Sequence, residues 1–435
     1  MKQLCVISCP IDTNSGYGAR SRDFFKALYE LKKEEWEFQI LPQRWGVTPW
    51  GYIRDNEKEW GWINPMLNKT GQLTRQPDVW IQVTIPNEFQ PIGKYNIGVT
   101  AGVETTICHH SWIEGLNRMN ITLVSSNHAK KVFQESAFQK KDQSGRVVEE
   151  IKLQKPVEVL FEGADLNTYF HIEDEDLEET ELVKSLDEIE ENFCYLFVGH
   201  WLQGEIGEDR KNTGLMLKTF LETFQNKKEK PALILKTSGA GASVMDREDM
   251  LKKIDAIRNQ VGENLPNVYL LHGELSDKDI NNLYNHKKVK AMFNLTKGEG
   301  FGRPILEFAL CKKPIIVSAW SGHVDFLKQE FTCFLGGDLK NVHPSAAAKD
   351  IILTEAQWFS PNTTQAKHYL KDVYENYKKY KELAKQQAHY CKTNFSYEKM
   401  KEVLAKYADA VPKQVQLQLP KLKKIELPKL KKVEA

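Results

Sequence analysis

The chain has 435 residues, of which 41% are hydrophobic and 27% charged, and its formal net charge is +1. This length suits two domains with separate cores, or one domain with large insertions, and the composition is that of a soluble globular protein. A transmembrane helix is excluded because no stretch reaches ~20 apolar residues, and a net charge near zero gives no global attraction to nucleic acid or membrane.

The N-terminal part of the chain is typical of a doubly wound α/β domain. Residues 3–7 form a buried-strand pattern, and the loop 14–19 with Gly16 and Gly18 leads into a helical run over 20–33. A strand, a glycine turn and a helix in this order open such a domain. Helical stretches lie between several of the later strands, which indicates a parallel sheet. These strands are predicted at 37–41, 79–83, 96–100 and 121–124.

Residues 44–66 depart from this alternation. Aromatic side chains gather there among charges: Trp45, Trp50, Tyr52, Trp60 and Trp62. We interpret the segment as a packed loop insertion. The alternative is a platform for an acceptor substrate, because aromatic faces stack on sugars and bases.

The second half of the chain repeats the pattern of strands and helices. Arg210 and Lys211 stand just before a helix over 214–225. The acidic run 173–191 is interpreted as a solvated helix or loop, and its segment 174–176 is not taken as a D-x-D metal motif, because that motif belongs at the end of a strand. The strands are predicted at 194–200, 232–236, 268–273, 291–295 and 315–317.

The stretch 296–323 carries the clearest chemistry. Its glycine loop lies between a predicted strand and a helix that begins near Pro304. Glycines let backbone N–H groups approach a phosphate, and the start of a helix favours its negative charge. Glu299 and Glu307 flank this loop, and carboxylates suit hydroxyl groups because each accepts two O–H donors. A phosphate and a polyol side by side indicate a nucleotide-sugar.

The sequence G-E-G-F-G-R-P-x-x-E over 298–307, with P-I-I-V-S after it, resembles the donor-site signature of a known enzyme family. This family is the retaining glycosyltransferases of the GT-B fold, the large E-x7-E group (glycosyl transferases group 1) that includes sucrose, mannosyl and glycogen-type synthases. The resemblance implies an α/β protein with two Rossmann-like, doubly wound domains that face a cleft. We expect the first domain, on the acceptor side, to span 1–165 and the second, on the donor side, 166–394. A helix over 395–410 would cross back to the first domain.

The resemblance also implies roles for particular residues. Glu299 would meet hydroxyls of the transferred sugar, and Glu307 the ribose of the nucleotide. Glu104 is the first candidate for a group near the transferred sugar, with His109 or His110 behind it. His200 stands where the family commonly has an arginine. The groups expected on the donor phosphates are the cations Arg210 and Lys211 and the backbone at Gly16, Gly18, Gly300, Phe301 and Gly302.

The expected activity is transfer of a hexose-type sugar from a UDP- or GDP-sugar to an acceptor hydroxyl, with retention and without a metal ion. Two alternatives remain. One is a nucleotide-sugar epimerase or hydrolase on the same fold, and the other is a non-catalytic nucleotide-sugar-binding module. The acceptor stays open: a small molecule, a glycan or a modified nucleobase in DNA.

Cysteine usage and the C-terminal segment bear on location and partners. Seven cysteines lie scattered without C-x-x-C spacing, and the N-terminus lacks a signal-peptide pattern, so we expect a cytoplasmic protein with reduced thiols and no structural zinc. Residues 411–435 hold seven lysines and two glutamates, and 419–426 repeats as 427–434. We interpret this tail as solvated and disordered, and the alternative is a handle for an acidic partner.

Overall fold

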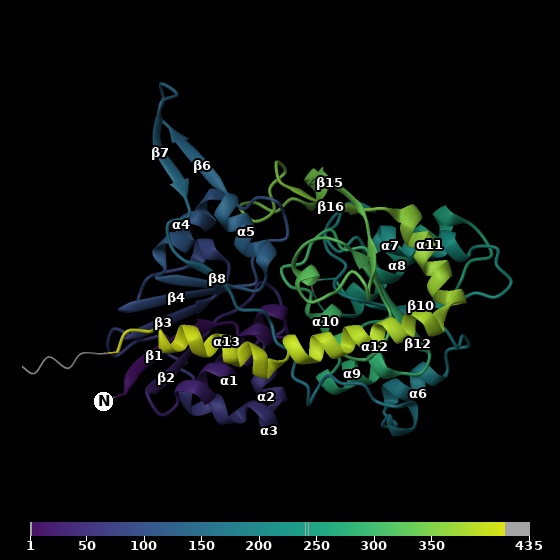
Figure 1. The fold of residues 1–435 in the computed structure, drawn as a ribbon, viewed down its shortest axis with the longest axis horizontal. Coiled ribbons are helices and arrows are strands. Elements are labelled where there is room, and N and C mark those ends of the chain that lie inside the picture. Colours follow the sequence, from purple (N-terminus) through teal and green to yellow (C-terminus); the bar gives the residue numbers. More distant parts are fainter. Residues whose placement is uncertain (1, 240, 242, 414–435) are drawn as a thin grey trace, which may run out of the picture.

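The structure, a computed structural model, describes residues 2–239, 241 and 243–413. It consists of two α/β lobes side by side, each built on a six-stranded sheet in which all paired strands run parallel (Figure 1). The predicted fold class is therefore confirmed. Most of the lysine-rich tail, residues 414–435, lies outside the described residues.

The first lobe is built on the sheet β2-β1-β3-β4-β5-β8. Its helix α1 (Gly16–Lys32) begins four residues before the predicted start, because Ser15 caps it and its Oγ accepts the N–H of Gly18 at 2.9 Å. Helices α4 (His110–Arg118) and α5 (Asn127–Glu135) follow β4 and β5. The strands are β1 (Gln3–Cys9), β2 (Trp36–Pro42), β3 (Val79–Val83), β4 (Tyr95–Thr100), β5 (Ile121–Val124) and β8 (Val157–Val159).

The second lobe is built on the sheet β11-β10-β9-β12-β13-β14. Its strands are β9 (Cys194–Val198), β10 (Ala232–Lys236), β11 (Val268–Leu271), β12 (Val289–Asn294), β13 (Ile315–Ser318) and β14 (Cys333–Leu335). Its helices are α6 (Glu181–Asp187), α7 (Thr213–Phe224), α8 (Val244–Val261), α9 (Asp277–Asn285), α10 (Arg303–Ala309) and α11 (Thr363–Glu375). The acidic residues 174–176 form an exposed 3-10 turn ahead of α6.

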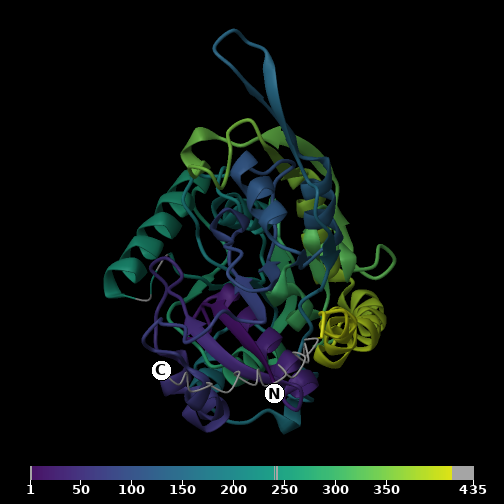
Figure 2. The same ribbon diagram turned by 90° about the vertical axis from the view of Figure 1, so that its left-hand side faces the viewer.

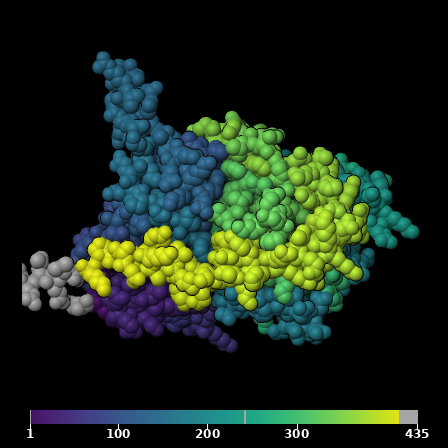
Figure 3. Space-filling view, in the orientation of Figure 1, coloured from purple at the N-terminus to yellow at the C-terminus, as the bar shows by residue number. Residues whose placement is uncertain are grey.

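Two hairpins and one insertion extend these lobes. The hairpin of β6 (Ala137–Lys141) and β7 (Val147–Lys152) projects away from the first lobe (Figures 1 and 3). The hairpin of β15 (Gly337–Asn341) and β16 (Gln357–Pro361) belongs to the second lobe, yet the N–H of Thr106 donates to the carbonyl of Gln357 at 2.8 Å and so ties it to the first.

The aromatic insertion packs against the first lobe, as interpreted from the sequence. It forms α2 (Tyr52–Asp55), α3 (Glu57–Trp60) and a 3-10 helix (Gly61–Met66). Trp60 and Ile63 are buried in the core, and Trp62 stacks on Phe25 of α1 with ring centroids 5.7 Å apart. Trp45 lies outside this packed part and stacks instead on Tyr17.

The last two helices join the lobes. Helix α12 (Tyr377–Asn394) lies along the second lobe, and α13 (Tyr397–Asp409) continues across to the first, as the yellow helices of Figures 1 and 3 show. Figure 2 views these helices from their ends at one side of the molecule. Met400, Leu404 and Ala408 of α13 are buried in the core of the first lobe, so the chain returns to complete the domain in which it began.

Leu404→Ala is expected to destabilise the first lobe by about 2–5 kcal/mol, because it leaves a cavity where a 2% exposed side chain packs. Urea unfolding followed by circular dichroism measures this loss. Lys406→Ala, at an exposed position of the same helix, is the control and should change stability by less than about 0.5 kcal/mol. Equal effects of the two substitutions would contradict the packing of α13 on the first lobe.

Candidate active site

A cleft lies between the two lobes. Its volume is about 360 Å³, and residues of both lobes line it. From the first lobe come the loop before α1 and the first turns of that helix, and from the second the ends of β9 and β10 and the starts of α9 and α10. Polar lining residues include Asn14, Ser15, Arg22, Asp23, His200, Lys236, Ser238, Glu274, Asp277, Tyr284, Arg303 and Glu307.

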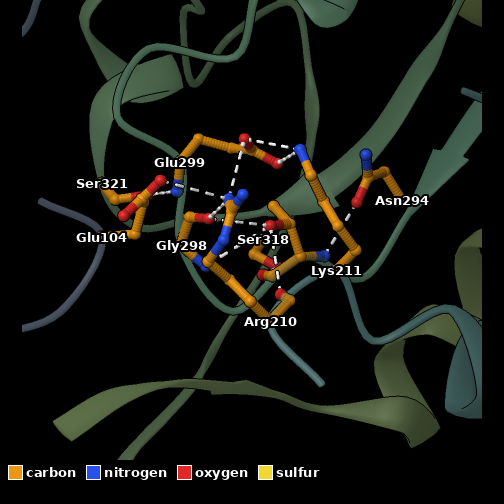
Figure 4. A network of polar contacts seen from close by, with 9 residues as sticks. Glu104, Arg210, Lys211, Asn294, Gly298, Glu299, Ser318 and Ser321 are labelled. Carbon is orange, nitrogen blue, oxygen red and sulfur yellow. Dashed lines mark hydrogen bonds and ion pairs between the residues drawn. The ribbon is translucent and has the colours of Figure 1, made fainter. Parts of the chain in front are cut away.

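A network of buried ion pairs also lies between the lobes (Figure 4), and its charged residues Glu104, Arg210, Lys211 and Glu299 are not among those that line the cleft. Glu299, only 5% exposed, accepts hydrogen bonds from Lys211 Nζ at 2.7 and 2.8 Å, one to each carboxylate oxygen. Arg210 Nη1 lies 3.4 Å from Glu299 Oε2 and 3.5 Å from Glu104 Oε1. Because Glu104 belongs to the first lobe, Arg210 joins carboxylates from both sides of the cleft.

Backbone contacts bring these charged groups together. The carbonyl of Arg210 accepts the N–H of Lys297 at 2.8 Å, and Arg210 Nη1 donates to the carbonyl of Gly298 at 2.9 Å. The N–H of Glu299 donates to Ser321 Oγ at 2.8 Å. The loops after β9, β12 and β13 thereby hold one another, and the charged side chains enter the site from a fixed backbone.

Glycine is required in the loop after β12 because the first lobe approaches it closely. A Cβ on Gly298 would lie 2.1 Å from the carbonyl oxygen of Glu104, and one on Gly300 would lie 2.6 Å from that of Ala101. The N–H groups of Gly300, Phe301 and Gly302 donate to no acceptor in the described part of the chain. Three backbone donors therefore remain for a ligand such as a phosphate.

The ion pairs decide the charge of Glu299. Burial disfavours its ionised form, but Lys211 and Arg210 together outweigh this effect and hold the pKa of Glu299 at about 2. Glu299 is therefore an anion at neutral pH. A carboxylate of this kind accepts O–H donors at both oxygens.

Glu307 lies in a second cluster of charges in the cleft. Its Oε1 accepts from Arg303 Nε at 3.1 Å, and Tyr284 donates to Oε2 at 3.3 Å. Arg303 is shared with the first lobe, since its Nη1 is 2.6 Å from Asp23 Oδ2. Burial raises the pKa of Glu307 to about 8, with Arg303 opposing the shift and nearby Asp277 adding to it. Because the Arg303 guanidinium is shared among three carboxylates, those of Asp23, Glu162 and Glu307, the charge of Glu307 is only partly compensated.

Sequence reasoning missed Arg303 and Asp23 as the link between the lobes. The arginine was visible within G-F-G-R-P as a cation inside the motif, but its partner lies 280 positions away on α1. Gly16, predicted to bind the donor phosphates, lines the cleft. Gly18 differs from the prediction. Its N–H is taken by Ser15, and a Cβ there would lie 2.2 Å from the carbonyl oxygen of Thr13, so it shapes the loop instead of binding a ligand.

The structure does not bring the two histidines behind Glu104 into the site. His109 caps α4 and lies 3.5 Å from Asp350, and His110 lies 3.6 Å from Glu114 on its own helix. His200 does line the cleft, with its Nδ1 3.3 Å from Ser238 Oγ, and burial lowers its pKa. The Phe301 side chain is buried in the core of the second lobe, so only its backbone faces the loop.

Two further observations concern metals and membranes. Among the described residues, no three His, Cys, Asp or Glu side chains lie close enough together to hold a metal ion. No helix in the described ranges has the length and hydrophobicity needed to span a bilayer.

Two Rossmann-like domains that face a common cleft define the GT-B class of glycosyltransferase folds. Solved structures with this fold match almost the whole chain. A glycosyltransferase from Rickettsia africae is 13% identical with a TM-score of 0.62, covering 94% of this chain and 98% of its own. Anabaena HepE in complex with UDP and glucose is 12% identical with a TM-score of 0.60, covering 94% and 100%. A UDP-forming α,α-trehalose-phosphate synthase from Burkholderia xenovorans is 9% identical with a TM-score of 0.57, covering 94% and 99%.

Residues 209–390 match the family model "Glycosyl transferases group 1". This range contains Arg210, Lys211, Glu299 and Glu307. The second lobe therefore carries the domain of this family, and the chain is a glycosyltransferase. No curated protein sequence matches it.

The raised pKa of Glu307 predicts a pH dependence of stability. Between about pH 4.5 and 8 the native protein keeps a proton on Glu307 that the unfolded chain has released, so this group's contribution to stability is lost as pH rises through that window. Glu307→Gln does not titrate. Its stability relative to the wild type should therefore rise from pH 5 to pH 9, on the order of a few kcal/mol.

Urea unfolding of both proteins at pH 5, 7 and 9 tests this expectation. Glu375→Gln, at an exposed position on α11, is the matched control and should track the wild type at each pH. A difference between wild type and Glu307→Gln that stays constant with pH would refute the assignment of a raised pKa.

Proposed function

We propose that the protein transfers a hexose-type sugar from a UDP- or GDP-sugar to an acceptor hydroxyl, with retention of anomeric configuration and without a metal ion. The observation that carries this proposal is the pairing of Glu299 with Lys211 beside three unpartnered backbone N–H groups. A sugar phosphate is bound by groups that accept hydrogen bonds from its hydroxyls and by a cation and amide donors that contact its phosphate. Glu299, Lys211 and the three N–H groups supply these functions close together.

Each group has a separate part in holding the donor. Glu299 accepts hydroxyls of the transferred sugar, and Glu307 accepts those of the ribose. Lys211 turns from Glu299 to the phosphates as the sugar hydroxyls take its place. The N–H groups of Gly300 to Gly302 and the backbone at Gly16 complete the phosphate site. Anabaena HepE was solved with UDP-glucose, which supports this sugar nucleotide as the first donor to test.

The reaction follows from where charge develops. The bond between the anomeric carbon and the β-phosphate oxygen breaks, and the leaving phosphate gains negative charge that Lys211, Arg210 and the loop amides stabilise. The acceptor oxygen bonds to the same face of that carbon, and its proton passes to the departing phosphate oxygen. Glu104, held by Arg210 at the border of the lobes, is proposed to lie beside the reacting sugar.

Glu307→Gln and Glu299→Gln should each lower donor turnover by about 10²–10³-fold while the protein stays folded, because each removes hydrogen bonds to the donor. Release of UDP or GDP from the sugar nucleotide measures turnover, first with the donor alone and then with an acceptor pool. Glu375→Gln serves again as the control. Wild-type turnover in either site variant would sink the assignment.

The same incubations separate the alternatives. Conversion of the sugar nucleotide without any acceptor would favour an epimerase or hydrolase. Nucleotide binding by calorimetry, with no turnover in any acceptor pool, would favour a non-catalytic binding module. A thermal-shift screen with UDP, GDP and ADP sugars identifies the donor base beforehand, because a ligand of the folded state raises the melting temperature.

A further inference from the structure

A groove on the first lobe lies apart from the donor cleft and shares no lining residue with it. Its volume is about 440 Å³, within the range of small-molecule sites. The ends of β1, β2 and β3 and the segment after β3 form its walls. It therefore lies on the lobe that faces the donor-binding loops, near the carboxyl edge of the sheet.

Two tryptophans give this groove its apolar walls. Trp80 is 3% exposed, and its indole N–H has no acceptor in the described ranges. Trp45 is partly exposed and stacks on Tyr17 with ring centroids 3.9 Å apart. A tryptophan face carries negative charge density that attracts the C–H groups of a sugar ring.

The polar residues of the groove balance in charge. Arg44 and Glu88 contribute one charge of each sign, and the other polar groups are neutral amides and hydroxyls. Gln82 holds one wall, since its Nε2 donates to the carbonyl of Glu88 and its Oε1 accepts the N–H of Gln90, both at 2.9 Å. A groove with one arginine and no lysine lacks the cations that a nucleic-acid backbone needs, and its amides suit hydroxyls better than an alkyl chain.

A short chain of contacts connects the groove to the donor-binding loop. Trp45 stacks on Tyr17, whose hydroxyl accepts the N–H of Ala101 at 3.1 Å. The carbonyl of Ala101 is the group that leaves no room for a Cβ on Gly300. Two residues, Tyr17 and Ala101, thus connect Trp45 to the loop proposed to hold the donor phosphates.

We propose that this groove binds the acceptor and that the acceptor is a neutral carbohydrate stacked on Trp45. The proposal rests on the proposed glycosyl transfer and names the class of its second substrate. Trp45 is the aromatic residue of the 44–66 segment that lines the groove, and the proposal gives it a role other than packing.

Saturation-transfer NMR of the full chain with maltotriose, cellotriose, mannotriose and galactotriose tests the proposal directly. At least one trisaccharide should bind the wild type, and Trp45→Ala should weaken that binding roughly three- to tenfold, as expected for loss of one aromatic contact. Trp45→Phe keeps a ring and should restore part of it. Trp62→Ala, which removes an aromatic of the same insertion that stacks on α1, should bind like the wild type.

Three results would overturn the proposal. The first is no saturation of any trisaccharide by the wild type, and the second is unchanged binding in Trp45→Ala. The third is salt-dependent binding of a DNA duplex that Arg44→Ala abolishes, which would assign the groove to nucleic acid. Thermal shifts with UDP and GDP in the same samples report the donor site separately, so failure of the proposed function and failure of the acceptor assignment are distinguishable.

Discussion

The ion pairs of Glu299 with Lys211 and Arg210 are the interaction on which the rest of the site depends. A carboxylate that is 5% exposed costs several kcal/mol in lost hydration unless it is paired and hydrogen-bonded. Both its oxygens are satisfied, and Arg210 extends the compensation to Glu104. Removing Lys211 would leave the buried Glu299 with only the 3.4 Å contact to Arg210. The loops after β9 and β12 therefore keep one arrangement relative to each other and to the first lobe.

The spacing of the lobes follows from a second buried cation and from close backbone packing. Arg303 holds Asp23 and Glu307 at once, while the loop after β4 rests directly on Gly298 and Gly300. Helix α13 then fixes the outer side by returning to the core of the first lobe. In the proposed reaction, hydroxyls of the transferred sugar displace Lys211 from Glu299, and Lys211 then meets the phosphates. Binding of the sugar is therefore coupled to binding of the phosphates.

The sequence predicted the local features well, because they depend on neighbouring residues. Buried strands, the glycine loop and the two flanking glutamates all have short-range signatures. The contacts across the lobes were not predictable in this way. No spacing rule connects Arg303 with Asp23. The sequence also gives no indication that His109 and His110 each lie beside another acidic residue, Asp350 and Glu114, and not beside Glu104. Gly18 was misassigned because a glycine needed for close packing and one needed for a ligand look alike in sequence. The start of α1 shifted because the cap at Ser15 was not recognised.

In the proposed mechanism Lys211 leaves Glu299 and binds the donor phosphates, while Glu299 accepts hydrogen bonds from hydroxyls of the transferred sugar. Isothermal titration calorimetry of Glu299→Gln with the nucleoside diphosphate and with its sugar conjugate tests this claim most directly. Because the substitution frees Lys211 and removes a negative charge, the diphosphate should bind as tightly as to the wild type or more tightly. The sugar conjugate should lose the extra affinity that its hydroxyls give in the wild type. Equal weakening of both ligands would contradict the account.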